Sequence, residues 1–124
     1  MKTQKILAVL VITTLISCTK TAEELIEQSE KNMQDSKVDL AIEDLQTLLK
    51  KHPTDSLASK AQYKLSSIYL NWKNDPEKGY EQLELILKKY AGSIHGEKAL
   101  DQINEFPEYL INKAESLRKQ KLLK

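Results

Sequence analysis

The only cysteine of the chain, Cys18, ends the stretch LISC, where an apolar run gives way to a long polar sequence. A thiol at such a place could form a disulfide or bind a metal ion. A lone cysteine cannot form a disulfide within its own chain. No second Cys or His stands near it at ligand spacing, which argues against a metal site. Cys18 therefore needs another explanation.

The residues before Cys18 form two distinct segments. MKTQK carries Lys2 and Lys5 and no acid, and the following run from Ile6 to Ile16 is aliphatic apart from two threonines. A basic segment followed by an apolar run of this length is typical of a secretory signal, and it is too short to cross a bilayer core of about 30 Å. A buried N-terminal helix is the alternative, but the run has no polar face.

The end of this apolar run resembles the lipobox of bacterial lipoproteins. The resemblance implies that residues 1–17 are a signal peptide and that lipid is attached at the following cysteine, where several acyl chains give stable membrane anchoring. Thr19, rather than Asp, comes next and favours the outer membrane. The covalent lipid is the only cofactor expected. The matching residues are Leu15, Ile16, Ser17 and Cys18.

Side chains suited to catalysis are sparse. The two histidines, His52 and His95, each stand near a predicted helix end, with no partner at metal spacing. Neither a glycine-rich phosphate loop nor a nucleophile elbow is present. Carboxylates such as Glu81 and Glu84 are better interpreted as solvent-facing partners of lysines. We predict a protein that is not an enzyme and that has no metal site and no small-molecule substrate.

The charge balance excludes another class of partner. The chain has 19 basic and 18 acidic side chains, a formal net charge of +1. Because the two numbers are nearly equal, the chain creates no strong electrostatic field that would attract nucleic acid. Lys50 and Lys51, and again Lys88 and Lys89, stand where the dipole of a predicted helix favours cations. No nucleic-acid partner is predicted, and three glycines, three prolines and 30% charged residues suit one small helical domain.

Apolar residues at intervals of three and four predict six helices and no strand. The first helix begins at Thr21, which has the capping-box spacing to Glu24. The pair Asp35 and Ser36 interrupts this helix. The second helix carries a stronger apolar stripe, and Pro53 prevents its continuation.

The later helices are expected to follow the same rules. Asp55 or Ser56 should cap the third helix, Asp75 should cap the fourth, and Gly92 should end the fourth. A fifth helix follows, and Pro107 begins the sixth. The aromatic residues of the third and fourth helices are expected in the core between helices: Tyr69, Trp72 and Tyr80.

An internal repeat indicates how these helices are organised. Residues 48–61 (LLKKHPTDSLASKA) match residues 86–99 (ILKKYAGSIHGEKA), 38 positions later. A repeated pair of antiparallel helices is the unit of an α-solenoid. The predicted fold is therefore all-α.

The repeated units resemble tetratricopeptide repeats (TPR). The resemblance implies a short TPR-like α-solenoid over residues 22–106, a lipidated tether at 18–21, and a C-terminal capping helix with a basic tail at 107–124. The residues that match the second helix of such a repeat are Ala41, Leu45, Leu48 and Pro53 in one unit, and Gly79, Leu83 and Ile86 in the next.

Together, the lipobox and the repeats resemble the BamD-like outer-membrane lipoprotein family. The resemblance implies a protein that is lipid-anchored at the outer membrane, faces the periplasm and binds protein partners in the cell envelope. It further implies a scaffold role, with envelope or outer-membrane protein assembly as the setting. The alternative is a structural subunit without a peptide groove, which self-associates or caps a larger complex through its helix ends.

The first helices of the two units carry apolar pairs that fall beside the packing stripe. Members of each pair are seven residues apart and share a helix face. In tetratricopeptide proteins the first helices line a concave groove for peptides, so the resemblance implies such a groove here. The alternative is that the C-terminal helix covers this strip. The candidate groove residues are Ile26 with Met33, Tyr63 with Leu70, and the flanking Ser67 and Asn71.

Overall fold

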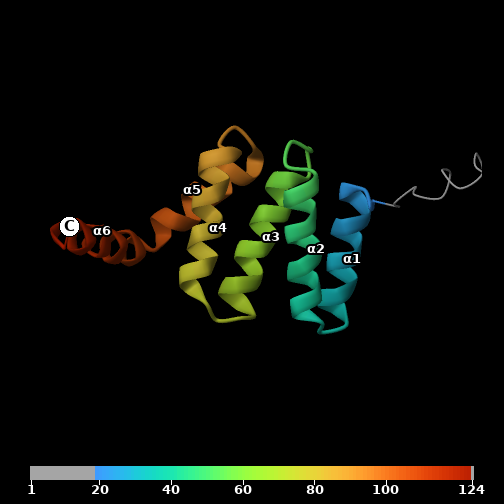
Figure 1. The fold of residues 1–124 in the computed structure, drawn as a ribbon, viewed down its shortest axis with the longest axis horizontal. Coiled ribbons are helices and arrows are strands. Elements are labelled where there is room, and N and C mark those ends of the chain that lie inside the picture. Colours follow the sequence, from blue (N-terminus) through green and yellow to red (C-terminus); the bar gives the residue numbers. More distant parts are fainter. Residues whose placement is uncertain (1–18, 124) are drawn as a thin grey trace, which may run out of the picture.

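The computed structural model describes residues 19–123, so the expected signal peptide, the lipobox and Cys18 lie outside the described residues. Within residues 19–123 the chain forms six helices and no strand, which confirms the predicted all-α class (Figure 1). No helix in this part of the chain is both long and apolar enough to span a membrane. The helices are α1 (Ala22–Gln34), α2 (Val38–Lys51), α3 (Ala58–Asn71), α4 (Pro76–Lys89), α5 (Ile94–Glu105) and α6 (Pro107–Leu122).

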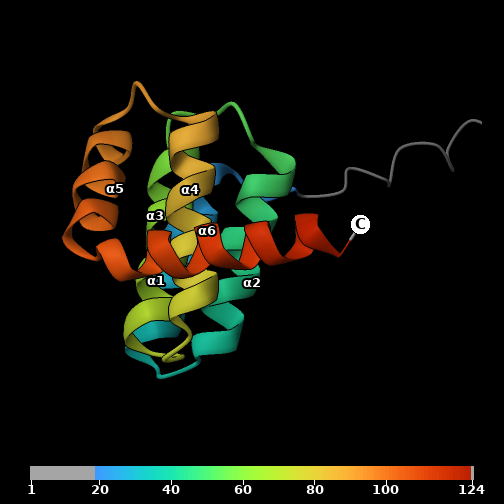
Figure 2. The ribbon, with the colours of Figure 1, turned by 90° about the vertical axis from the view of Figure 1, so that its left-hand side faces the viewer.

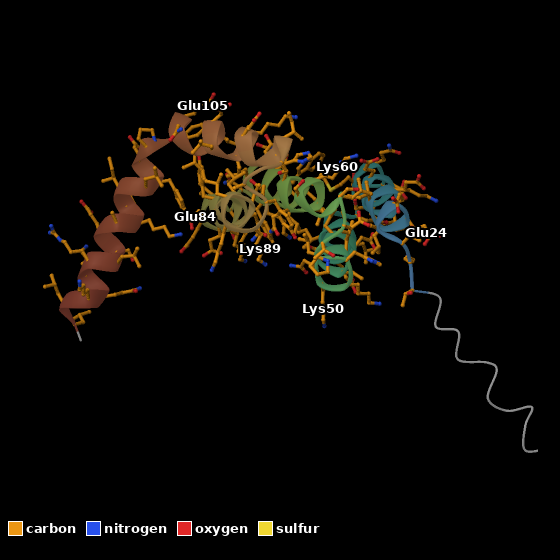
Figure 3. The ribbon with its side chains drawn as sticks, turned by 90° about the horizontal axis from the view of Figure 1, so that it is seen from above. Glu24, Lys50, Lys60, Glu84, Lys89 and Glu105 are labelled. Carbon is orange, nitrogen blue, oxygen red and sulfur yellow. The ribbon has the colours of Figure 1, made fainter. Side chains whose placement is uncertain are left out.

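The first four helices form two antiparallel pairs, α1–α2 and α3–α4, which stand side by side in chain order (Figure 1). The second helix of the first pair begins at Val38 and that of the second pair at Pro76, 38 residues later. This spacing equals the shift found in the sequence, so the repeat corresponds to a repeated helix pair. Viewed from above, α1, α3 and α5 lie on one side of the stack, and α2 and α4 lie on the other (Figure 3).

Short polar residues fix three helix beginnings. Thr21 and Glu24 form the predicted capping box: Thr21 Oγ1 accepts from the Glu24 N–H at 3.2 Å, and Glu24 Oε2 accepts from the Thr21 N–H at 2.8 Å. Asp75 caps α4, with Pro76 in the first turn. Ser93 caps α5 and accepts from the Gly96 N–H at 3.1 Å.

Two predicted helix boundaries are wrong. The N-cap of α3 is Leu57, which makes no side-chain cap bond, because Asp55 is held in the preceding turn, where Oδ1 accepts from the Leu57 N–H at 2.8 Å. Helix α4 ends before Gly92, since its C-cap is Tyr90. The Tyr90 hydroxyl donates to the carbonyl of Pro53 at 2.9 Å, which ties this helix end to the loop after α2.

The buried side chains form two clusters. Helices α1, α2 and α3 build the first, whose largest fully buried members are Leu45, Leu48 and Leu65. Helices α4 and α5 build the second around Leu83 and Ile86. Tyr90 packs against both clusters and joins them, and Lys88 and Lys89 precede it at the basic end of α4.

The aromatic residues expected in this core divide between core and surface. Tyr80 is buried and Tyr69 is half-buried against the first cluster, as predicted. The prediction is wrong for Trp72, whose side chain is 59% exposed. Helix α3 ends at Asn71, and Trp72 is its C-cap. The side chain of Trp72 therefore no longer lies on the buried face of the helix, because the chain here begins to turn toward α4.

Helix α6 leaves the stack. Figures 2 and 3 show it crossing α4 and diverging toward the side of α2 and α4. A single residue, Phe106, connects α5 to α6. Longer loops join the two helices within each earlier pair: residues 35–37 between α1 and α2, and residues 72–75 between α3 and α4. One residue followed by a proline cannot reverse the chain as those loops do, and none of the residues of α6 is buried.

Candidate protein-binding surface

The six residues predicted to line one groove lie in different surroundings. The prediction is wrong for Ile26, whose side chain is 5% exposed and belongs to the first core cluster. Met33 and Ser67 line a pocket between α1 and α3, whereas Leu70 and Asn71 line a separate cleft between α4 and α6. Asn71 Nδ2 donates to Ser67 Oγ at 3.2 Å, at the boundary between the two.

Tyr63 faces the fifth helix rather than an open groove. Its ring lies against the imidazole of His95, with 5.7 Å between centroids. His95 Nδ1 is hydrogen-bonded to Ser59 Oγ at 3.0 Å, which links α5 to α3 again. Burial lowers the pKa of His95, and the nearby charges of Lys98 and Lys60 lower it further. Helix α5 therefore covers the part of the strip that Tyr63 occupies.

The pocket between α1 and α3 is small and mixed in character, with a volume of about 320 Å³. Leu45 and Ile68 contribute buried apolar side chains, and Met33 and the exposed Trp72 stand among its lining residues. At its edge Lys64 Nζ forms an ion pair with Glu30 Oε1 at 2.8 Å. The hydrogen bond from Lys64 holds the pKa of Glu30 below its usual value. An aromatic ring and a thioether beside an ion pair suit a peptide side chain.

The cleft between α4 and α6 is larger, at about 780 Å³. Three aromatic residues form one side of it. The Tyr80 and Tyr109 rings stack with centroids 4.3 Å apart, and the Phe106 and Tyr80 rings meet edge to face with centroids 6.1 Å apart. Leu70 and Leu117 add apolar surface from α3 and α6. We call this space the α4–α6 cleft.

The first half of α6 is fixed to α4 by polar contacts. Lys113 forms an ion pair with Glu84, and the Tyr109 hydroxyl donates to Glu84 Oε1 at 3.3 Å. Figure 3 shows Glu84 on the side of α4 that faces α6. Burial raises the pKa of the Tyr109 hydroxyl. Burial lowers the pKa of Lys113, but its hydrogen bonds to Glu84 and Tyr109 outweigh this effect and raise it overall. Beyond Lys113, no ion pair or side-chain hydrogen bond holds the described part of α6.

Other polar side chains inside the stack serve helix packing. Asn32 Nδ2 donates to Asp44 Oδ2 at 2.7 Å, and Gln62 donates to Gln82. Ser66 Oγ is buried without a hydrogen-bond partner. Among residues 19–123 no group of three or more His, Cys, Asp or Glu side chains is arranged to hold a metal ion. The hydrogen bonds of Asn32 and Gln62 each connect the two helices of one pair.

The sequence predicts Met33 and Ser67 of one surface and Leu70 and Asn71 of the other, but it does not predict the aromatic residues of either surface. The apolar spacing of α3 continues to Trp72 and predicts a core position for it. The aromatic cluster of Tyr80, Phe106 and Tyr109 brings together residues of different helices, so no local pattern identifies it. The useful signal was the sequence EFPEY, where two aromatic residues flank a proline between two helices.

Comparisons of the chain with protein-family models, curated proteins and solved structures found no match.

Proposed function

We propose that this chain is a lipid-anchored TPR protein that faces the periplasm at the outer membrane and acts as a protein-interaction scaffold. The lipobox ending at Cys18 and the apolar run before it support the anchor. The stacked helix pairs and their 38-residue repeat support the scaffold. The resemblance to BamD-like lipoproteins supports a role in envelope or outer-membrane protein assembly. We propose no catalytic step and no nucleic-acid or small-molecule partner.

The observation that carries the binding role is the exposed indole of Trp72 beside the pocket between α1 and α3. Large aromatic side chains at the centre of a surface often provide most of the binding energy of an interface. Met33 adds a flexible apolar wall, and the ion pair of Lys64 with Glu30 offers polar contacts at the rim. This surface suits a short segment of a partner protein with one apolar anchor.

The anchor is tested with Cys18→Ala and with an inhibitor of the lipoprotein signal peptidase. Each should leave the signal peptide uncleaved, and the larger form should be detected by mass spectrometry. The wild-type protein should stay with membranes after a high-salt wash and carry the mass of added acyl chains. An unmodified wild-type protein, or one whose mass is the same after both treatments, would contradict the anchor.

The binding surface is tested with Trp72→Ala in the full chain, expressed in its native membranes and crosslinked to neighbouring proteins. Trp72→Ala should remove at least one crosslinked species that the wild-type protein forms. Ile94→Ala is the matched control, because Ile94 is exposed to a similar degree but lies outside both binding surfaces. A crosslinking pattern unchanged by Trp72→Ala would show that this pocket is not the site.

A second candidate function is a structural subunit that self-associates through its helix ends. The observation that favours it is that α6 exposes four large aliphatic side chains, those of Leu110, Ile111, Leu117 and Leu122. About three helix pairs are usually needed to complete a stable solenoid, and residues 19–123 form two pairs and the additional helices α5 and α6.

A further inference from the structure

The part of α6 that does not line the α4–α6 cleft carries apolar side chains and a net positive charge, with Arg118, Lys119 and Lys121 against Glu115. Ala114, Arg118, Lys121 and Leu122 are all exposed and lie outside the cleft lining. Their spacing of three and four residues places them on one side of the helix. We call these four residues the outer face of α6. No other described helix packs against them.

Helices α1 to α5 of the described chain do not cover the outer face. Phe106 alone links α6 to α5, and Lys113 and Tyr109 fix the first half of α6 on α4. The second half therefore points away from the stack (Figure 3). A helix that exposes leucine and alanine in this way lacks the partner that usually stabilises a helix in a protein.

The α4–α6 cleft is complementary in charge to this outer face. Glu77 and Glu81 line the cleft four residues apart in the first two turns of α4, and Glu108 joins them from α6. All three carboxylates are exposed. Among residues 19–123, Lys113 is the one basic residue of the lining, and Glu84 already pairs with it. The cleft thus has an acidic rim over an aromatic side, which suits a helix bearing leucine, Arg118 and Lys121.

The size of the cleft also fits. Its volume is about 780 Å³. Two turns of helix with their side chains, about 10 Å wide and 11 Å long, fill roughly this space. The outer face of α6 between Ala114 and Leu122 extends over slightly more than two turns.

From these four features we propose that a second copy of this chain is the occupant of the cleft. In this dimer the outer face of α6 from each copy enters the α4–α6 cleft of the other, so a two-fold axis generates two identical contacts. Pairing α6 with α6 through the outer faces is disfavoured, because it brings Arg118 and Lys121 of both copies together. The proposal deepens the second candidate function and rests on it, and it does not require the lipid anchor.

The experiment uses two full-length copies with different tags, expressed together and purified through one tag. The cleft variant is Glu77→Lys with Glu81→Lys, and the helix variant is Arg118→Glu with Lys121→Glu. Each variant expressed with itself should lose co-purification about tenfold or more, because like charges then face each other in both contacts. The cleft variant expressed with the helix variant should restore co-purification, since opposite charges meet again in one contact and the other is unchanged.

The matched control is Glu23→Lys with Glu27→Lys, which makes the same change in the first two turns of α1. Both residues are exposed and stand at the same helix positions as Glu77 and Glu81. This control should co-purify with itself as the wild-type protein does, and circular dichroism should show all variants to be helical. Two wild-type copies that do not co-purify would overturn the proposal. So would a cleft variant that pairs with itself normally, or a mixture that fails to restore pairing. Loss of the Trp72-dependent crosslink is a separate result and bears only on the scaffold function.

Discussion

Helices α2 and α6 have comparable lengths, with 14 and 16 residues, and both carry leucine and isoleucine at helical spacing. Yet α2 buries four side chains in the core, and α6 buries none. The difference lies in both the connection and the residues. Residues 35–37 let α2 fold back on α1, whereas the single residue Phe106 precedes α6. The apolar residues of α2 gather on one face, whereas α6 is more polar and its apolar residues are spread around the helix, so linker length and helix composition both keep α6 out of the core.

The largest effect should come from removing core atoms in α2. Leu45 is fully buried, so Leu45→Ala should lower the free energy of unfolding by about 2–5 kcal/mol through lost transfer energy and a cavity. Leu110→Ala in α6, where the side chain is exposed, should change it by about 0.5 kcal/mol or less. Urea unfolding followed by circular dichroism measures both. Equal losses would mean that α6 is part of the cooperative core.

The next largest loss of stability should come from a substitution at Gly79 in α4, where α3 packs closely. A Cβ added at Gly79 would lie 2.5 Å from Leu70 Cγ, so Gly79→Ala should destabilise the protein by about 1–3 kcal/mol through overpacking. Adding Leu70→Ala should return part of this loss, because it removes the clashing atoms. Gly92→Ala is the matched control, since a Cβ there meets open space. A thermal midpoint for Gly79→Ala above that of Gly92→Ala would refute close packing of α3 on α4.

The stability that comes from the contact of α5 with α3 should depend on pH. Burial holds the pKa of His95 below its ordinary value of 6.5, so the unfolded chain takes up this proton more readily. Stability from His95 is therefore complete above about pH 6.5 and declines as the pH falls toward the folded pKa. His95→Asn should flatten the curve of unfolding free energy against pH between about pH 7.5 and 5.5. An identical slope in wild type and variant would contradict the burial of this imidazole against Tyr63.

The smallest effect should come from the ion pair that fixes α6. Glu84 and Lys113 are each about one-third exposed, so Glu84→Gln should cost less than about 1 kcal/mol of global stability. Hydrogen exchange should nevertheless become faster in the first half of α6, because the pair and the Tyr109 bond hold this segment on α4. Lys78→Gln, which breaks an exposed pair with Asp75, is the control that should leave exchange in α6 unchanged. Equal exchange rates for α6 in wild type and Glu84→Gln would assign its position to the aromatic contacts alone.

Sequence patterns correctly predicted the features that depend on residues close together in the sequence. The capping box of Thr21 and Glu24 and the Asp75–Pro76 start of α4 follow from side chains that bond to backbone within one turn. The stripe of α2 follows from its spacing. The 38-residue repeat predicted paired helices because it compares two parts of the chain directly.

Sequence patterns failed where position in space decides the outcome. Trp72 continues the stripe of α3 in spacing, but the helix ends one residue earlier and the indole is exposed. Ile26 lies beside the expected stripe, yet α1 meets both α2 and α3, so a wider face of α1 is buried. The direction of α6 depends on the geometry at Phe106 and on its contact with Glu84, and no periodic pattern encodes either. The lipid anchor at Cys18 and the envelope partners stay predictions.

The fixed first half of α6 also has a mechanical consequence. Helix α6 is held on α4 only as far as Lys113, so the nine residues from Ala114 to Leu122 extend beyond this contact as a rigid arm of about 14 Å. A tilt of about 10° at Lys113 would move the far tip of this arm by roughly 2 Å. Distances between spin labels on α2 and at the tip of α6 would report this motion directly.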